Sequence, residues 1–244
     1  MNQRPLSELL EEAFAECRDM DASLGDRLQA FADAVRSMGE EFQSSVDQLV
    51  IRLREHEVGE HAPKPGEPMP NFILPDEQGS LVSLERLIED GPVAVVFHRG
   101  NWCPYCRINT KALAESQDQV AAVGGQIVAI MPDRQHYTGA LQEDSGATFP
   151  ILTDFENGYA MSLNIAFWVG DEMQSMMCHA GWDVAPSQGS DTWLLPIPAT
   201  FVVGADGLVK ARFVDPDYRK RMAIEDLLAA FREARSAPPA DDQS

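Results

Sequence analysis

Strand and helix patterns alternate between residues 68 and 235, and this alternation constrains the fold more than any other feature of the sequence. The apolar runs Val93–His98 and Gln126–Met131 are typical of buried strands. Further along the chain, Thr200–Val203 and Leu208–Phe213 flank a turn and predict a hairpin. This order predicts an α/β domain whose parallel central strands are closed by an antiparallel hairpin.

Helical patterns lie between these strands, over about 106–123, 135–144 and 158–166. Residues 168–196 show no regular pattern, so we expect a long irregular segment there. Its large apolar side chains are Trp168, Met173, Met176, Met177, Trp182 and Trp193. A segment of this composition must pack against something, and it forms either a wall beside the functional site or a patch of the core.

The N-terminal region differs, because it carries only helical signals. From Leu24 to Leu53 the apolar residues recur at steps of three or four, which predicts one long helix with a single apolar stripe. This stripe needs a partner surface, which is the core domain, a shorter helix around Leu6–Phe14, or a second copy in a homodimer. The proline-rich stretch 61–70 ends the helical region. The predicted divisions are an N-terminal helical extension (1–62), an α/β domain (63–235) and a polar tail (236–244).

Charge narrows the range of partners. The chain carries 19 basic and 39 acidic residues, a formal net charge of −20. Such a chain repels phosphate backbones and anionic lipids, which argues against nucleic acid and membrane surfaces. Because the N-terminus lacks the pattern of a signal peptide and the longest apolar run is far too short to span a bilayer, we expect a cytoplasmic protein.

Two of the four cysteines, Cys103 and Cys106, follow the strongest strand and open a helix. At this spacing they can meet disulfide geometry with little backbone movement. A helix N-terminus lowers the pKa of a thiol in its first turn, and Pro104 suits the first helical position. The pattern therefore predicts a redox-active pair, which we call the dithiol site. Helix position favours Cys103 as the nucleophile, because Cys106 lies one turn deeper.

A zinc site is an alternative use of this pair, and it would need four ligands. Cys178 and His179 could complete the set, but the strand–helix context favours redox chemistry. We therefore expect neither a metal nor a cofactor. Cys178 is otherwise a spare or an additional resolving thiol, and Cys17 is incidental.

The segment FHRGNWCPYC resembles the active-site turn of the thioredoxin superfamily. Trp102 resembles thioredoxin, and the Pro104–Tyr105 dipeptide resembles glutaredoxin. The segment Ile197–Phe201 resembles the loop of that fold in which a cis-proline, here Pro198 before Thr200, lies beside the active cysteine. With GEPMPNFILPDEQGSLVSLERL and PATFVVGADGLVKARFVDPDY, residues 64–232 resemble the peroxiredoxin-like branch of the alkyl hydroperoxide reductase/thiol-specific antioxidant (AhpC/TSA) family.

This resemblance implies a thioredoxin-like fold and a thiol-dependent antioxidant oxidoreductase that reduces hydroperoxides through a Cys103/Cys106 dithiol–disulfide cycle. It also implies a thiol reductant such as thioredoxin or glutathione. Two alternatives remain open. One is a thioredoxin- or glutaredoxin-like oxidoreductase acting on disulfides, and the other is a non-enzymatic redox sensor or interaction module.

The chain departs from the peroxiredoxin motif Pro-x-x-x-Thr-x-x-Cys. Aligned on the turn, Cys106 takes the place of the peroxide-attacking cysteine and Cys103 that of the threonine. Arg99 stands at the proline, and Pro198 stands where the family has its arginine. In the family, that threonine and that arginine donate hydrogen bonds as charge develops on the peroxide. Arg99 is the candidate substitute, while Trp102 and Tyr105 are expected to shape the surface of the site. His98 is either a base near neutral pH or a satisfied strand residue.

Overall fold

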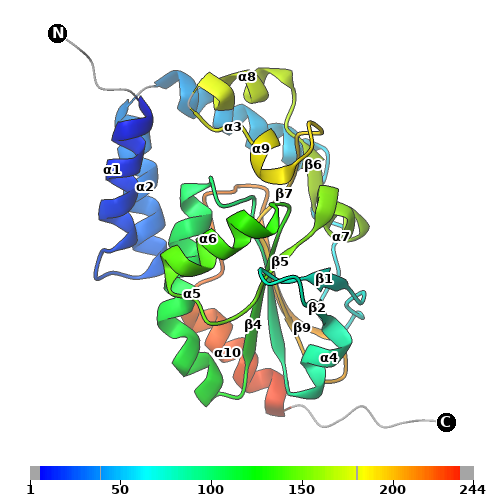
Figure 1. Ribbon diagram of the computed structural model, residues 1–244. Helices are drawn as coiled ribbons and strands as arrows, with labels where there is room; N and C mark the ends of the chain where they lie inside the picture. Colours follow the sequence, from blue (N-terminus) through cyan, green and yellow to red (C-terminus); the bar gives the residue numbers. More distant parts are fainter. Residues whose placement is uncertain (1–5, 39, 180, 237–244) are drawn as a thin grey trace.

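A five-stranded mixed sheet lies at the centre of the computed structural model, which describes residues 6–38, 40–179 and 181–236 (Figure 1). The spatial order of its strands is β5 (Ile151–Thr153), β4 (Gln126–Met131), β3 (Val93–Phe97), β8 (Ala199–Val203) and β9 (Val209–Val214). β3, β4 and β5 are parallel, whereas β8 and β9 run antiparallel to their neighbours. The predicted thioredoxin-like α/β architecture with its closing hairpin is thus confirmed.

Helices surround this sheet on both faces (Figure 1). They are α1 (Leu6–Arg18), α2 (Leu24–Met38), α3 (Glu40–Glu55), α4 (Leu84–Glu89), α5 (Pro104–Ala122), α6 (Gln135–Ser145), α7 (Gly158–Ser162), α8 (Asp171–His179), α9 (Ala185–Gln188) and α10 (Ile224–Ser236). A 3-10 turn (Phe155–Asn157) and two antiparallel pairs, β1 (Ile73–Pro75) with β2 (Leu81–Ser83) and β6 (Ala166–Trp168) with β7 (Leu194–Pro196), complete the elements. Within the described ranges, no helix is both long and apolar enough to cross a bilayer.

The two faces of the sheet bury separate hydrophobic clusters, because successive side chains of a strand point to opposite faces. From β3, Ala94 and Val96 join a cluster with α5 and α10, to which Phe231 belongs. Val95 and Phe97 join the larger cluster on the other face, which also contains residues of the N-terminal helices. The dithiol site joins this larger cluster, at the point where β3 ends and α5 begins.

The prediction of one long helix over Leu24–Leu53 is wrong. Two helices, α2 and α3, share the stripe and run in different directions (Figure 1), while Gly39 lies outside the described residues. A straight helix of this length would extend about 45 Å and leave most of its stripe in solvent. With two helices, α2 packs on α1 and α5, and α3 packs on α8. The stripe is therefore satisfied within the chain.

Two predictions for the second half of the domain are also wrong. The helix expected over 158–166 ends at Ser162, and β6 begins at Ala166. The expected irregular segment 168–196 contains α8, α9 and β7. α8 and α9 have only 9 and 4 residues. Helices this short are stabilised by tertiary packing, so the sequence shows no clear helical pattern for them.

The proline-rich stretch 61–70 is non-helical, as predicted, but it is held against the sheet. The N–H of Gly66 donates to the carbonyl of Val209 at 2.8 Å, and the N–H of Val209 donates to the carbonyl of Glu67 at 2.9 Å. The stretch therefore pairs with the edge strand β9. Since buried side chains such as Phe14 and Phe31 also join the larger core cluster, the N-terminal helices and the α/β domain pack as one body.

Candidate active site

The dithiol site is built by a six-residue turn between β3 and α5. Cys103 is the N-cap of α5, with extended backbone, and Pro104 follows at the first helical position. The N–H of Cys106 donates to the carbonyl of Cys103 at 3.0 Å and closes the first turn of the helix. Both thiols are free and buried, with exposed fractions of 1% for Cys103 and 0% for Cys106.

Two positively polarised groups converge on the sulfur of Cys106. The backbone N–H of Arg99 donates to it at 3.3 Å, and Nη2 of Arg221 donates to it at 3.2 Å. The Cys103 sulfur has a weaker environment, since its nearest guanidinium atom, Nη1 of Arg99, is 3.9 Å away. The hydrogen-bond donors of the site are therefore directed mainly at Cys106.

The thiol pKa values follow this asymmetry. Burial raises the pKa of Cys103 well above its ordinary value, and the neighbouring Cys106 adds to the shift. Burial opposes ionisation of Cys106 too, but a hydrogen bond from Cys103 and the charge of Arg221 outweigh it, so the pKa of Cys106 falls well below its ordinary value. The argument from helix position favoured Cys103, whereas the surrounding charges favour the thiolate of Cys106.

Arg99 is clamped between two aromatic rings. Its guanidinium carbon is 3.9 Å from the ring centroid of Tyr218 and 4.9 Å from that of Trp102. Tyr218 packs edge-on against Tyr105 at 5.6 Å, and Tyr105 packs against Phe31 of α2 at 5.0 Å. This aromatic chain links the turn, the loop after β9 and the N-terminal helices, and it immobilises a cation that is only 4% exposed.

The buried side chain of Asp133 anchors the turn of the dithiol site through a hydrogen bond. Oδ2 of Asp133 accepts a hydrogen bond from the N–H of Asn101 at 2.7 Å, and Oδ1 accepts one from the hydroxyl of Ser187 at 3.1 Å. Burial, only partly offset by these hydrogen bonds, raises the pKa of Asp133 to about 6. Asp133 thus ties the turn to the loop after β4 and to α9.

The predicted cis-proline is wrong, since the described residues contain no cis peptide bond and Pro198 is trans. Trans is the lower-energy isomer for most X–Pro bonds, and here Pro198 leads directly into β8. Thr200 is buried in β8, where it pairs with Val96 and Phe213. Neither Pro198 nor Thr200 supplies any of the polar contacts to the sulfurs described above.

His98 is buried beneath helix α5. Its Nε2 is 3.2 Å from the hydroxyl of Thr110, which donates to the carbonyl of Cys106 at 2.9 Å. Its Nδ1 has no hydrogen-bond partner, and the same is true of Nε of Arg99, Nε of Arg221 and Nε1 of Trp102. The site therefore holds several spare N–H donors and could satisfy the acceptor oxygens of a small ligand. Among the described residues, no cluster of three His, Cys, Asp or Glu side chains could hold a metal ion.

Sequence reasoning missed Arg221, Tyr218 and Asp133. Arg221 and Tyr218 lie on the loop between β9 and α10, and 115 positions separate Arg221 from Cys106. The only sequence signal was a segment after the predicted hairpin, Asp217 to Arg221, in which every residue but Tyr218 is charged. A run of this kind is normally read as a solvated loop.

Comparisons with known proteins identify the family to which a chain with this site belongs. Residues 65–212 match the sequence profile of the AhpC/TSA family. The chain belongs to the AhpC/TSA family. Rv2521 of Mycobacterium tuberculosis, which is named as a peroxiredoxin, is 30% identical over 90 residues, 37% of this chain and 57% of the relative. The chain thus spans just over half the length of this relative.

Other similarities link the AhpC/TSA chain to two kinds of thiol protein. The thiol:disulfide interchange protein DsbE of Pseudomonas aeruginosa is 22% identical over 149 residues, 61% of this chain and 66% of that protein. Peroxidoxin BcpB from Mycobacterium tuberculosis superposes with a TM-score of 0.55 at 22% identity, covering 71% of this chain and 99% of that chain. Reduced Prx3 of Vibrio vulnificus, solved with hydrogen peroxide, gives a TM-score of 0.55 at 17% identity, covering 69% and 98%. The two superpositions establish the peroxiredoxin-type fold.

Proposed function

We propose that the protein is a thiol peroxidase in which Cys106 attacks the hydroperoxide and Cys103 resolves the product. The observation that carries this proposal is the contact of 3.2 Å between Nη2 of Arg221 and the sulfur of Cys106. Arg221, from another part of the chain, takes the role of the arginine that the family has at the position of Pro198. Cys106 is therefore the thiol that is poised as a thiolate, and only the thiolate is nucleophilic.

In the first step, the Cys106 thiolate attacks the terminal oxygen of the hydroperoxide and the O–O bond breaks. Cys106 becomes a sulfenic acid, and the departing alkoxide takes a proton from solvent to leave as an alcohol. Arg221 and Arg99 each carry an unpartnered Nε–H beside the sulfurs, and these donors can stabilise the charge that develops on the leaving oxygen.

In the second step, the Cys103 sulfur attacks the sulfur of Cys106. A disulfide forms, and the sulfenic oxygen leaves as water with the thiol proton of Cys103. Two further thiols then restore the dithiol and are themselves oxidised to a disulfide. Over one cycle, one hydroperoxide is reduced to an alcohol and water while two thiols lose one electron each.

Thioredoxin-like exchange with protein disulfides is the second candidate, and the similarity to DsbE favours it. In that mechanism Cys103 would be the nucleophile. Its raised pKa and its 1% exposed fraction oppose this role, because a protein disulfide must reach the attacking sulfur. The closed site is better suited to a small oxidant.

The test is a stopped-flow reaction of the fully reduced protein with hydrogen peroxide, followed by tryptophan fluorescence. We expect a rate far above that of a free thiol, complete loss of reaction in Cys106→Ser, and a preserved first step in Cys103→Ser. A dimedone-type probe should trap a sulfenic acid on Cys106 only in the second variant. Loss of the peroxide reaction in Cys103→Ser with retention in Cys106→Ser would overturn the assignment.

A further inference from the structure

An open cleft of about 460 Å³ lies between the N-terminal helices and the loop after β9. α2 and α3 form one wall, and the loop residues Asp217, Arg219, Lys220 and Arg221 form the other. Arg221 is the residue whose guanidinium contacts Cys106. Arg221 therefore connects the wall of the cleft to the dithiol site, and the volume of the cleft falls within the range of small-molecule sites.

The lining of the cleft carries more cations than carboxylates, in a strongly acidic chain. Its lining contains four cationic side chains, from Arg36, Arg219, Lys220 and Arg221, and two acidic ones, from Asp47 and Asp217. The lining residues thus have a balance of +2, from four minus two, and the carboxylates of Asp33 and Asp215 just outside the lining bring the surroundings to neutral, whereas the whole chain has a formal charge of −20. A cleft of one sign concentrates ligands of the opposite sign, even when the net charge of the protein would repel them.

The cations at the mouth of the cleft are held loosely. Lys220 pairs with Asp215 at 3.4 Å, with its side chain 55% exposed, and Arg36 pairs with Asp33 at 2.8 Å, with its side chain 57% exposed. Exposed pairs of this kind contribute little free energy, on the order of 0–1 kcal/mol. Both cations can therefore exchange their carboxylate partner for one on a ligand.

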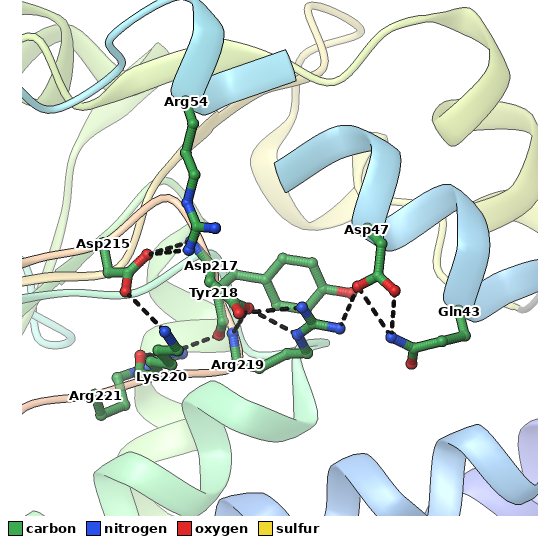
Figure 2. Close-up of polar contacts among 9 residues, drawn as sticks. All are labelled: Gln43, Asp47, Arg54, Asp215, Asp217, Tyr218, Arg219, Lys220 and Arg221. Atoms are coloured by element: carbon green, nitrogen blue, oxygen red, sulfur yellow. Dashed lines mark hydrogen bonds and ion pairs between the residues drawn. The ribbon is translucent and has the colours of Figure 1, made fainter. Parts of the chain in front are cut away.

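Gln43, Asp47, Asp217 and Arg219 form a polar bridge (Figure 2). It lies between this cleft and a small cavity lined by Cys103. Gln43 donates to Asp47 at 3.0 Å, and Nη1 of Arg219 donates to Asp47 at 2.8 Å, while Asp217 holds the other side of the same guanidinium. Gln43 and Arg219 line both spaces, so their contacts with Asp47 form the wall between them. The inner cavity measures about 20 Å³, room for about one water-sized molecule.

We propose that the open cleft is the binding site of the reductant, and that the reductant is a small thiol carrying carboxylate groups. This inference rests on the proposed function, because it assigns the step that regenerates the dithiol. Carboxylates of the thiol pair with Arg36 and Lys220 at the mouth. The sulfhydryl end then passes the bridge between Asp47 and Arg219 and reaches Cys103.

The direction of attack follows from the chemistry of exchange. A thiolate attacks the Cys103 sulfur of the disulfide, the S–S bond breaks, and Cys106 leaves as a thiolate. Cys106 is the better leaving group, because thiols of lower pKa leave faster. A second thiolate attacks the sulfur of the bound reductant, releases it as a symmetrical disulfide, and leaves Cys103 to take up a proton. Two electrons pass to the protein, one from each thiol.

The test uses the full-length protein oxidised with diamide, so that it does not depend on any reaction with peroxide. Reduction is followed with three thiols of similar size: 3-mercaptopropionate, 2-mercaptoethanol and cysteamine, which are anionic, neutral and cationic. Rates are expressed per thiolate at low ionic strength. We expect the anionic thiol to react about tenfold faster than the cationic one, with the preference lost at high salt.

Arg36→Gln/Lys220→Gln should bring the rate of the anionic thiol to that of the neutral one. The matched control, Lys64→Gln/Lys210→Gln, removes two cations outside the cleft and should preserve the preference. Equal rates for the three thiols, or fastest reduction by cysteamine as the net charge alone predicts, would overturn the proposal. Failure of diamide to form a disulfide between Cys103 and Cys106 would also overturn the proposal. A thioredoxin that reduces the protein faster than all three thiols would do the same, provided that the three thiols show no charge preference.

Discussion

The guanidinium of Arg221 lies 3.2 Å from the sulfur of Cys106, although 115 positions separate the two residues. The loop that carries Arg221 is fixed from both sides. Tyr218 stacks on Arg99 at 3.9 Å, and Arg219 is bonded to Asp217 and to Asp47 of α3 (Figure 2). The cation at the dithiol site therefore depends on the N-terminal helices as well as on its own loop.

Arg221→Gln should raise the pKa of the Cys106 thiol, because the variant removes a charge that, beside the hydrogen bond from Cys103, opposes the effect of burial. Reaction with hydrogen peroxide at neutral pH should slow about 10- to 100-fold. The pH dependence of alkylation at Cys106, located by mass spectrometry, measures the pKa. Arg54→Gln removes one charge from an exposed ion pair with Asp215 and should change neither value. An unchanged alkylation profile in Arg221→Gln would contradict the assigned role.

Arg99→Lys keeps the charge but loses the planar group that lies between Trp102 and Tyr218. We expect the free energy of unfolding to fall by about 1–2 kcal/mol, and the peroxide reaction to slow as the turn loosens. Chemical denaturation measures the first effect. Arg86→Lys, at a side chain that is 78% exposed, serves as the control and should leave stability within about 0.5 kcal/mol. Equal stability of the two variants would show that the aromatic clamp contributes nothing.

Local patterns predicted most of the α/β domain, because its strands are buried on both faces and read as continuous apolar runs. Gln126–Met131, for example, is β4 with the predicted bounds. The apolar stripe of the N-terminal region, in contrast, continues unchanged across α2 and α3. The spacing of the stripe carries no sign of the change in direction, and Gly39 weakens the predicted helix only locally. After the change, α2 packs against α5 and α3 packs against α8.

The candidate site was predicted only where its parts are contiguous in sequence. Cys103, Cys106 and Arg99 lie on one turn, so spacing alone brings them together. Arg221 and Asp133 reach the same turn through the topology of the sheet, which brings the loops after β9 and β4 to it. Propensity and periodicity describe elements one at a time and cannot give such distances. This is why the helix-position argument selected Cys103 while the assembled charges favour ionisation of Cys106.

Asp47→Asn should weaken the bridge between α3 and the loop that carries Arg221. Because the Asp47 side chain is 47% exposed, we expect a loss of stability of no more than about 1 kcal/mol. Alkylation of Cys103 by a neutral reagent should nevertheless become several-fold faster as the wall of the inner cavity opens. Mass spectrometry after timed exposure measures this. Asp33→Asn, which breaks the exposed pair of Asp33 with Arg36 on α2, should leave the alkylation rate unchanged.

Asp133→Asn should remove one source of the pH dependence of the free energy of unfolding. Burial raises the pKa of Asp133 to about 6 from a model-peptide value of 3.8, so the folded state holds this proton more tightly than the unfolded state. Its contribution to stability is then greatest below pH 4 and is lost as the pH rises through 6, a change of about 2–3 kcal/mol. Denaturation of both proteins between pH 4 and 7 should show the stability of the wild type falling relative to Asp133→Asn across this window. Asp47 should give a pH dependence of the opposite sign, because Gln43 and Arg219 lower its pKa against the effect of burial. The stability of the wild type should therefore rise relative to that of Asp47→Asn as the pH rises. A difference between wild type and Asp133→Asn that does not vary with pH would mean that the carboxylate is ionised in the fold as readily as in water, and that its bonds to Asn101 and Ser187 fully offset its burial.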